Sequence, residues 1–297
     1  MNKAIDYIGV FFRVLIAVLI FLVVQIAVIE AFTFLGIDIK IYKGLFTAVY
    51  SIVCILAFVI YDKVRSYKRE KLIRTDKVGA HKFIAAVVLA FGLLGIVTVY
   101  MYIATWLSAV FAPVAEHMEE YSDRMDRFSD VDTAIVPYWD SLIGFIASFM
   151  FVPLAEELTF RGAIFGEFMC KFNAIVSALL SSLVFALLHG ISVQIGYALI
   201  CGVIMALAYH YTGSIWITYI IHASFNLFGS ALFTLLDSGI FGQMEVAANI
   251  AAFHASIIEV ICIVPAAAAF ILLYKDYKDE QKTATPIEAF AEPEVAV

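Results

Sequence analysis

Three groups of polar residues interrupt the apolar stretches in the second half of the chain. Ionisable side chains inside membrane-length apolar segments are rare and costly, so we take them as functional candidates. A carboxylate in such a segment can act as a general base, and imidazole and amide groups can donate hydrogen bonds to an oxyanion. This combination favours hydrolysis of a carbonyl compound. The candidate catalytic residues are Glu156, Glu157, Arg161, His189, His222 and Asn226.

The first group lies in MFVPLAEELTFRG, residues 150–162. Glu157 and Arg161 are four residues apart, so on an α-helix they share a face and can form an ion pair that lowers the cost of burying both. Glu156 is turned about 100° away from Glu157 and faces a different neighbour. Pro153, one turn earlier, is expected to kink the helix. The unpaired Glu156 is therefore the predicted general base.

The second and third groups lie on two further apolar segments. His189 lies in FALLHG at the end of its apolar segment, four residues after Phe185, and His222 and Asn226 are four apart within HASFN. Each group alone has a structural interpretation, because buried ion pairs and intramembrane histidines also hold helices together. Three such groups on three separate apolar segments favour a shared polar pocket instead.

The composition places these residues in a membrane protein. Apolar residues make up 63% of the chain and charged residues only 15%, with a mean hydropathy of +0.95. Soluble domains have nearly half apolar and about a quarter charged residues. Since every backbone group needs an internal partner in lipid and the apolar runs do not alternate, we expect helices. No basic, aromatic-rich face suggests nucleic-acid binding, and the four cysteines lack metal or disulfide spacing.

The predicted fold class is all-α, a polytopic membrane helix bundle of about eight transmembrane helices with a polar intramembrane cavity. A spanning helix needs about 20 mostly apolar residues. The predicted spans are roughly 8–35, 44–61, 83–112, 142–170, 174–189, 191–210, 214–236 and 249–274.

The distribution of charge predicts the orientation of the bundle. Lys and Arg are concentrated in Asp62–Lys82, which is expected to be cytoplasmic. Two spans precede this segment and the total is even, so both termini are also expected in the cytoplasm. The acidic segment Pro113–Ser141 would then be a solvated outer loop. The predicted location is the cell membrane, crossed several times.

Four regions follow from this pattern. Residues 1–141 form the N-terminal transmembrane helices with the basic and acidic loops. Residues 142–236 form the core that carries all three polar groups, and residues 237–274 form a C-terminal span. Residues 275–297 are rich in Glu, Ala, Pro and Thr and are predicted to be a disordered cytoplasmic tail.

These motifs resemble those of the CPBP family, which comprises type II CAAX prenyl endopeptidases and bacteriocin-processing proteins and is also known as the Abi family. Its motifs EExxxR, FxxxH and HxxxN occur here in that order and without departure. The resemblance covers about residues 142–236. The matching positions are Glu156-Glu157…Arg161, Phe185…His189 and His222…Asn226.

The resemblance implies an intramembrane endopeptidase that acts on a membrane-associated peptide or protein. It implies a helical bundle around a water-accessible cavity, in which Glu156 and His189 activate a water molecule. His222 and Asn226 would stabilise the oxyanion. In the same comparison the Glu157–Arg161 pair would hold the site in shape, and Phe185 would pack beside the second motif.

Metal use is left open by the sequence. A zinc site needs three protein ligands and an open position, which Glu156, His189 and His222 could supply. A metal-free glutamate protease would use the same residues. An asparagine four residues after His222 fits an oxyanion hole better than a ligand set, which favours the metal-free alternative.

Two other functions compete with proteolysis. A non-catalytic member of the same fold, acting as a scaffold or bacteriocin-immunity protein, has no chemical need for all the motif residues. A proton-coupled transporter could use Glu156 and Glu157 as a relay, but no pair of broken helices in matching halves is evident. The expected partners are a substrate at the membrane and the lipid bilayer. Neither the natural substrate nor the oligomeric state follows from the sequence.

Overall fold

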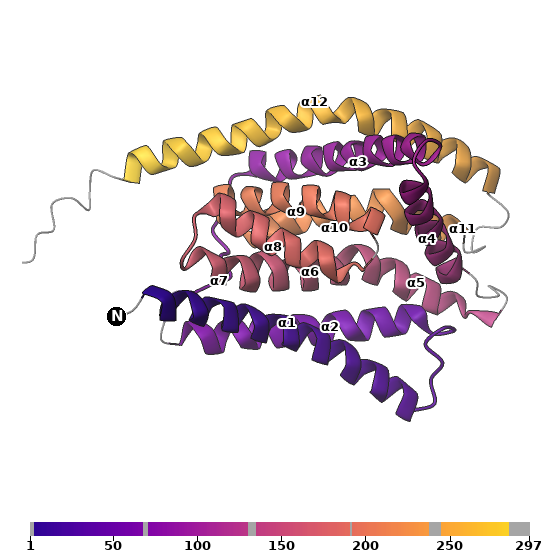
Figure 1. Ribbon diagram of the computed structural model, residues 1–297, viewed down its shortest axis with the longest axis horizontal. Helices are drawn as coiled ribbons and strands as arrows, with labels where there is room; N and C mark the ends of the chain where they lie inside the picture. The colour runs from indigo at the N-terminus through magenta and orange to yellow at the C-terminus, as the bar shows by residue number, and fades with distance from the viewer. Residues whose placement is uncertain (1–2, 68–70, 130–134, 191, 238–244, 285–297) are drawn as a thin grey trace, which may run out of the picture.

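The computed structural model describes residues 3–67, 71–129, 135–190, 192–237 and 245–284. Within these residues all regular elements are helices, and a single isolated antiparallel β-bridge joins Thr75 to Ser214. Most of the helices run roughly along one common direction as a bundle (Figure 1). The predicted all-α membrane bundle is confirmed.

Seven helices in the described part of the chain are long and apolar enough to cross a membrane, and one shorter apolar helix accompanies them. The shorter helix corresponds to the predicted span 174–189. The long candidates are Tyr7–Phe34, Lys43–Ser66, Ala80–Ser108, Tyr138–Met169, Val193–Thr212, Ile215–Leu235 and Phe253–Thr283.

The helices are numbered as in Figure 1, with π-helical segments labelled η. In chain order they are α1 (Lys3–Phe34), α2 (Lys43–Ser66), α3 (Ala80–Ser108), α4 (Ala112–Ser129), α5 (Tyr138–Ile146), η2 (Ala147–Phe151), α6 (Val152–Glu156), η3 (Glu157–Ile164), α7 (Phe165–Met169), α8 (Ala174–Leu188), α9 (Ser192–Thr212), α10 (Ile215–Asn226), η4 (Leu227–Ala231), α11 (Leu232–Asp237) and α12 (Glu245–Ala284).

The fourth span is one continuous helix of mixed type, running from α5 through η2, α6 and η3 to α7. Pro153 is the second residue of α6, directly after the π-helical segment η2. Proline removes a backbone donor and clashes with the preceding turn, so a wider turn before it relieves the clash. Single π-helical turns are frequent at functional sites. A π-helical turn thus comes directly before the turn of Pro153, where the sequence predicts a kink.

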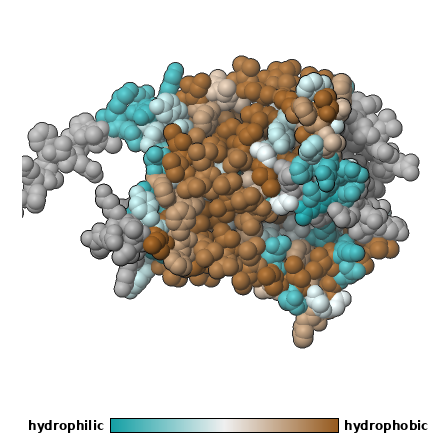
Figure 2. All heavy atoms as spheres, viewed as in Figure 1, coloured by the Kyte–Doolittle hydropathy of each residue, from teal (hydrophilic) through white to brown (hydrophobic). Residues whose placement is uncertain are grey.

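The outer surface of the bundle is apolar. Figure 2 shows a broad hydrophobic band across the molecule, with hydrophilic residues gathered towards its ends. Large apolar side chains such as Phe12, Ile26, Ile261 and Val264 are more than half exposed. Surface of this extent is incompatible with water and fits a hydrocarbon environment. The chain is a multi-pass membrane protein.

Two hydrophobic clusters form the interior. The first includes Phe58, Phe160 and Phe185 and joins α1 and α2 to η3 and α8. The second includes Leu93 and Ile217 and joins α3, α9, α10 and α12. The fourth span and α10, which carry most of the polar motif residues, therefore lie between two packed groups of helices.

The basic segment is anchored in the bundle rather than lying wholly in solvent. Asp62 accepts hydrogen bonds from the backbone N–H groups of Leu72 and Ile73, both at 3.1 Å. The Ile73 side chain packs against Gly162, where a Cβ would contact it. Gly162 follows Arg161 directly, so this loop supports the helix turn that carries the first motif.

The acidic segment contains a helix, α4, where the sequence predicted a solvated loop. Its half-buried residues Val114, Met118 and Tyr121 recur every three or four positions, which is the pattern of a helix lying on an apolar surface. Because many residues of this segment are charged, the weak periodicity of its apolar residues was not apparent from the sequence. The acidic side chains are on the opposite, solvent side: Glu116, Glu119, Glu120 and Asp123.

Helix α12 continues to Ala284, whereas a disordered tail was predicted from residue 275. Glu280 ties the extension to the bundle through the buried Lys82 of α3, at 2.8 Å, and the exposed Lys282 lies 2.8 Å from Asp279. Partner residues three positions apart suit a helix, and this local pattern outweighed the low apolar content. The rest of the predicted tail, 285–297, lies outside the described residues.

Asp140 of α5 caps the start of α2 and is expected to contribute to the stability of the bundle. Its two carboxylate oxygens accept from the backbone N–H groups of Gly44, at 2.7 Å, and Leu45, at 2.8 Å. Asp140→Ala leaves one buried and one partly buried N–H group without a partner and is expected to lower the free energy of unfolding by about 2 kcal/mol. Denaturant titration of the purified protein measures this loss. Asp140→Asn keeps one acceptor and should lose less; equal stability of all three proteins would contradict the capping role.

Candidate active site

The first motif spans the junction of α6 and η3. Glu156 is the last residue of α6, and Glu157 and Arg161 lie in η3. Arg161 Nη1 is 2.9 Å from Glu157 Oε1, and both side chains are almost completely buried. The i,i+4 pairing expected from the spacing is thus present. A buried pair of opposite charge holds both groups in fixed positions, because separating them would leave a bare charge in the bundle.

His222 of α10 lies between the two glutamates. Its Nδ1 is 2.8 Å from Glu157 Oε1, and its Nε2 is 3.4 Å from Glu156 Oε2. The Glu157 side chain is fully buried, whereas 20% of the Glu156 side chain is exposed. Because an ionised carboxylate only accepts hydrogen bonds, Nδ1 of His222 must be protonated and donate its hydrogen bond to Glu157. Glu156 is then the more accessible of the two carboxylates and is not paired with Arg161.

His189 follows the last residue of α8 and is half-buried. Its Nδ1 is 2.9 Å from the backbone carbonyl oxygen of Phe185. A carbonyl oxygen only accepts hydrogen bonds, so Nδ1 must be the donor. In the neutral ring this leaves Nε2 unprotonated and able to accept a proton.

The Phe185 ring connects all three motifs. Its centroid lies 4.5 Å from the His189 ring and 6.3 Å from the His222 ring. The guanidinium carbon of Arg161 lies 4.6 Å from the same centroid, in a cation–π contact. The spacing FxxxH is thus explained by a packing role, in which one ring fixes the relative positions of two imidazoles and a guanidinium.

Asn226, the last residue of α10, is directed elsewhere. Its side-chain amide donates to the backbone carbonyl oxygen of Ser148 at 3.0 Å, in the π-helical segment η2. The amide has two N–H groups, so one of them is not used by this bond. The structure therefore brings Glu156, Glu157 and His222 into direct contact, whereas the Asn226 side chain bonds to the backbone of η2, five residues before Pro153.

The candidate zinc ligands do not form a metal site in this geometry. Among the described residues no three His, Cys, Asp or Glu side chains are grouped closely enough to hold a metal ion. The Nδ1 of His222 is bonded to Glu157, and its Nε2 faces Glu156. His189 directs Nδ1 to a carbonyl oxygen. We therefore derive no catalytic step through a metal.

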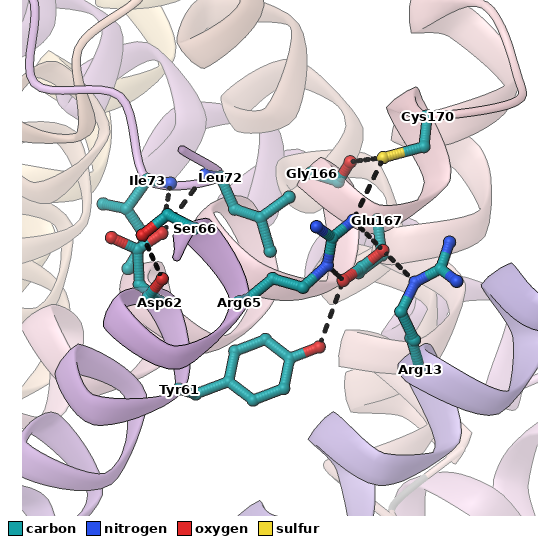
Figure 3. A network of polar contacts seen from close by, with 10 residues as sticks. All are labelled: Arg13, Tyr61, Asp62, Arg65, Ser66, Leu72, Ile73, Gly166, Glu167 and Cys170. Atoms are coloured by element: carbon teal, nitrogen blue, oxygen red, sulfur yellow. Dashed lines mark hydrogen bonds and ion pairs between the residues drawn. The ribbon is translucent and has the colours of Figure 1, made fainter. Parts of the chain in front are cut away.

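A second buried carboxylate, which was not among the predicted site residues, lies on the same span. The Glu167 side chain of α7 is completely buried and pairs with Arg13 of α1 and Arg65 of α2 (Figure 3). An arginine in the first apolar run and a glutamate in the fourth were visible as intramembrane charges. No local spacing links them, because 154 positions separate Arg13 from Glu167.

Comparison with known families identifies the segment that holds all three motifs. Residues 138–228 match the family described as type II CAAX prenyl endopeptidase Rce1-like. The match runs from the start of α5 to η4 and includes Glu156 through Asn226. The family resemblance predicted from the motifs is confirmed for this segment.

One similar protein is the UPF0177 protein YxdF of Lactococcus lactis subsp. lactis (strain IL1403), which is 41% identical over 88 residues. The aligned region is 29% of this chain and 48% of the relative, so the chain spans about half the length of the curated relative it matches. No solved structure matches the chain significantly.

Proposed function

We propose, from the Rce1-like segment at residues 138–228, that this protein is an intramembrane endopeptidase that hydrolyses a peptide bond of a membrane-associated substrate. One observation carries the proposal. Glu156, a partly exposed carboxylate on a membrane span, lies beside the Nε2 of a histidine whose other nitrogen is fixed by Glu157. A base next to an oriented imidazole is the arrangement that acid–base hydrolysis requires.

In the proposed reaction Glu156 removes a proton from a water molecule, and the water oxygen attacks the carbonyl carbon of the scissile peptide bond. The resulting oxyanion accepts hydrogen bonds from the second N–H of Asn226 and from Nε2–H of His222, whose ring carries protons on both nitrogens in this scheme and is positively charged beside Glu157. The protonated Glu156 then gives its proton to the leaving amine as the C–N bond breaks. His189 has an unprotonated Nε2. We propose that this nitrogen acts beside Glu156 as a second acceptor for the proton that leaves the water molecule.

Glu157 and Arg161 act as positioning residues in this scheme. Glu157 holds the proton on Nδ1 of His222 and thereby directs Nε2 towards Glu156. Arg161 balances the buried charge of Glu157. This division explains why adjacent glutamates have different surroundings, one buried against an arginine and one partly exposed.

Substitution of Asn226 tests the oxyanion hole. Asn226→Ala and Asn226→Asp both remove the amide donor, and each is expected to lower turnover about 100- to 1000-fold. The loss should appear mainly in kcat, because the developing oxyanion exists only in the transition state. The control is Ser230→Ala, one turn later in η4, whose hydroxyl bonds only to the backbone of Asn226. Unchanged kcat in both Asn226 variants would remove this residue from the mechanism.

The overall function is tested with purified protein in detergent–lipid micelles. A panel of fluorogenic peptides should include one with a prenylated C-terminus, so that prenyl dependence is measured rather than assumed. Cleavage by the wild type that is lost in His189→Ala is expected. Absence of cleavage of every peptide, with proton flux into proteoliposomes that depends on Glu157, would replace proteolysis by transport.

We also propose that the protein lies in the cell membrane with both termini in the cytoplasm. The support is the concentration of Lys and Arg in residues 62–82 and of Asp and Glu in residues 113–141. Cysteine labelling from outside intact cells would test the orientation. Asp123→Cys in α4 should react with an impermeant reagent, and Lys63→Cys in α2 should not.

A further inference from the structure

A buried ionic cluster joins three helices at the end of the bundle that carries the basic segment (Figure 3). Glu167 of α7 accepts from Arg13 Nε at 2.6 Å and from Arg65 Nε at 2.5 Å. Arg65 Nη2 adds a bond of 3.2 Å, and the Tyr61 hydroxyl one of 3.3 Å. The carboxylate of Glu167 is completely buried and uses both oxygens.

The charges in this cluster do not balance. Glu167 contributes one negative charge, whereas Arg13 and Arg65 contribute two positive charges, since arginine stays protonated in proteins. The remaining neighbour drawn on Arg65 is the thiol of Cys170, at 3.8 Å. Within the described residues no second carboxylate forms an ion pair with either arginine. Among the residues that the structure describes, one positive charge is therefore left without a negative partner in a membrane-spanning region, where charge is costly.

The uncompensated charge is best placed on Arg13. Arg65 is the more deeply buried arginine, with 11% of its side chain exposed against 24% for Arg13. Arg13 bonds to Glu167 through Nε alone. Its two terminal nitrogens point away from the carboxylate (Figure 3). They form a planar fork of donors, which matches the oxygens of a phosphate or carboxylate.

The surroundings of Arg13 on α1 are those of a lipid-facing surface. Arg13 lies six residues inside the span that begins at Tyr7, or about 9 Å along the helix. A long side chain at this depth reaches the headgroup level of the bilayer. Tyr7 and Phe11 are both more than 40% exposed and pack against the ring of Phe172. Aromatic side chains of this kind are typical of the membrane interface.

We propose that Arg13 binds the phosphate group of an anionic phospholipid, with the acyl chains lying along the exposed aromatic residues of α1. The lipid supplies the negative charge that the cluster lacks, so that Glu167, two arginines and one phosphate are neutral together. Basic pockets between transmembrane helices are known to hold anionic headgroups. The proposal is independent of peptide hydrolysis, because none of these residues belongs to the candidate active site.

Native mass spectrometry of the full chain tests the proposal. The protein is released from micelles containing equal amounts of phosphatidylglycerol and phosphatidylcholine with the same acyl chains. Wild-type protein should retain phosphatidylglycerol preferentially, and Arg13→Gln should reduce this preference about five- to tenfold. Lys63→Gln is the matched control, because it removes one exposed positive charge near the same end of α2. The control should keep the wild-type preference.

Two further measurements cover a variant that fails to fold and a site that binds free phosphate. If Arg13→Gln unfolds, Arg13→Lys retains a cation for Glu167 but lacks the fork, and it should show a clear partial loss of preference. Inorganic phosphate added at constant ionic strength should leave the lipid adduct intact. Equal retention of the two lipids by wild type, an unchanged preference in Arg13→Lys, or displacement of the lipid by free phosphate would each overturn the proposal.

Discussion

Replacement of Glu156 by Gln is expected to lower peptide hydrolysis by about two to four orders of magnitude without unfolding the protein. The amide cannot accept the proton that the carboxylate takes from water, yet it has the same shape and can still contact His222 Nε2, now 3.4 Å from the carboxylate. The effect should fall on kcat. The measurement is turnover of the best fluorogenic peptide, together with thermal unfolding of both proteins.

Glu259→Gln is the matched control for this experiment. Glu259 of α12 is also a buried intramembrane carboxylate, but it accepts from the Thr98 hydroxyl at 2.9 Å, away from the motifs. Its substitution should leave kcat unchanged. Glu156→Gln with activity close to wild type would contradict the assignment of the base. A similar loss in both variants would indicate a general effect of membrane charge instead.

Pairings within one helix were predictable from the sequence. Glu157 and Arg161 are neighbours on any helix with roughly four residues per turn, so they remain paired at 2.9 Å although their segment is π-helical. The separation of Glu156 from Arg161 follows from the same geometry. The spans themselves were predictable because about 20 apolar residues are needed to cross the bilayer.

Pairings between helices were not predictable in the same way. The position of His222 between Glu156 and Glu157 depends on the rotation of α10 against the fourth span, which no spacing encodes. The bond from Asn226 to the carbonyl oxygen of Ser148 requires the π-helical turn η2, and Pro153 alone does not indicate its extent. Tertiary packing determines both arrangements.

Ion pairs between residues far apart in the sequence were not predictable either. Any intramembrane charge predicts a partner, but the sequence does not say which of several candidates it will meet. Arg13 and Arg65 converge on Glu167 because α1, α2 and α7 are adjacent at one end of the bundle. The half-buried helix α4 was likewise hidden, since its apolar stripe is narrow beside many exposed acids.

The largest effect on stability is expected at Arg161. Arg161→Met keeps an apolar stem of similar length but leaves the buried Glu157 carboxylate without its guanidinium partner, while the hydrogen bond from His222 remains. Removal of one partner of a buried ion pair typically costs about 3–5 kcal/mol. We expect a loss of that size in the free energy of unfolding, measured by denaturant titration in mixed micelles. Loss of the guanidinium also removes the cation–π contact with Phe185.

A double substitution separates charge from packing. Glu157→Gln combined with Arg161→Met removes both charges while keeping a group that can accept from His222 Nδ1, so stability should return close to wild type. Activity should stay low, because a neutral amide holds the proton of His222 less firmly than the carboxylate at 2.8 Å. If the double variant is as unstable as Arg161→Met, the pair matters through the shape of Arg161 and its contact with Phe185. In that case Arg161 would not stabilise the protein mainly by balancing the charge of Glu157.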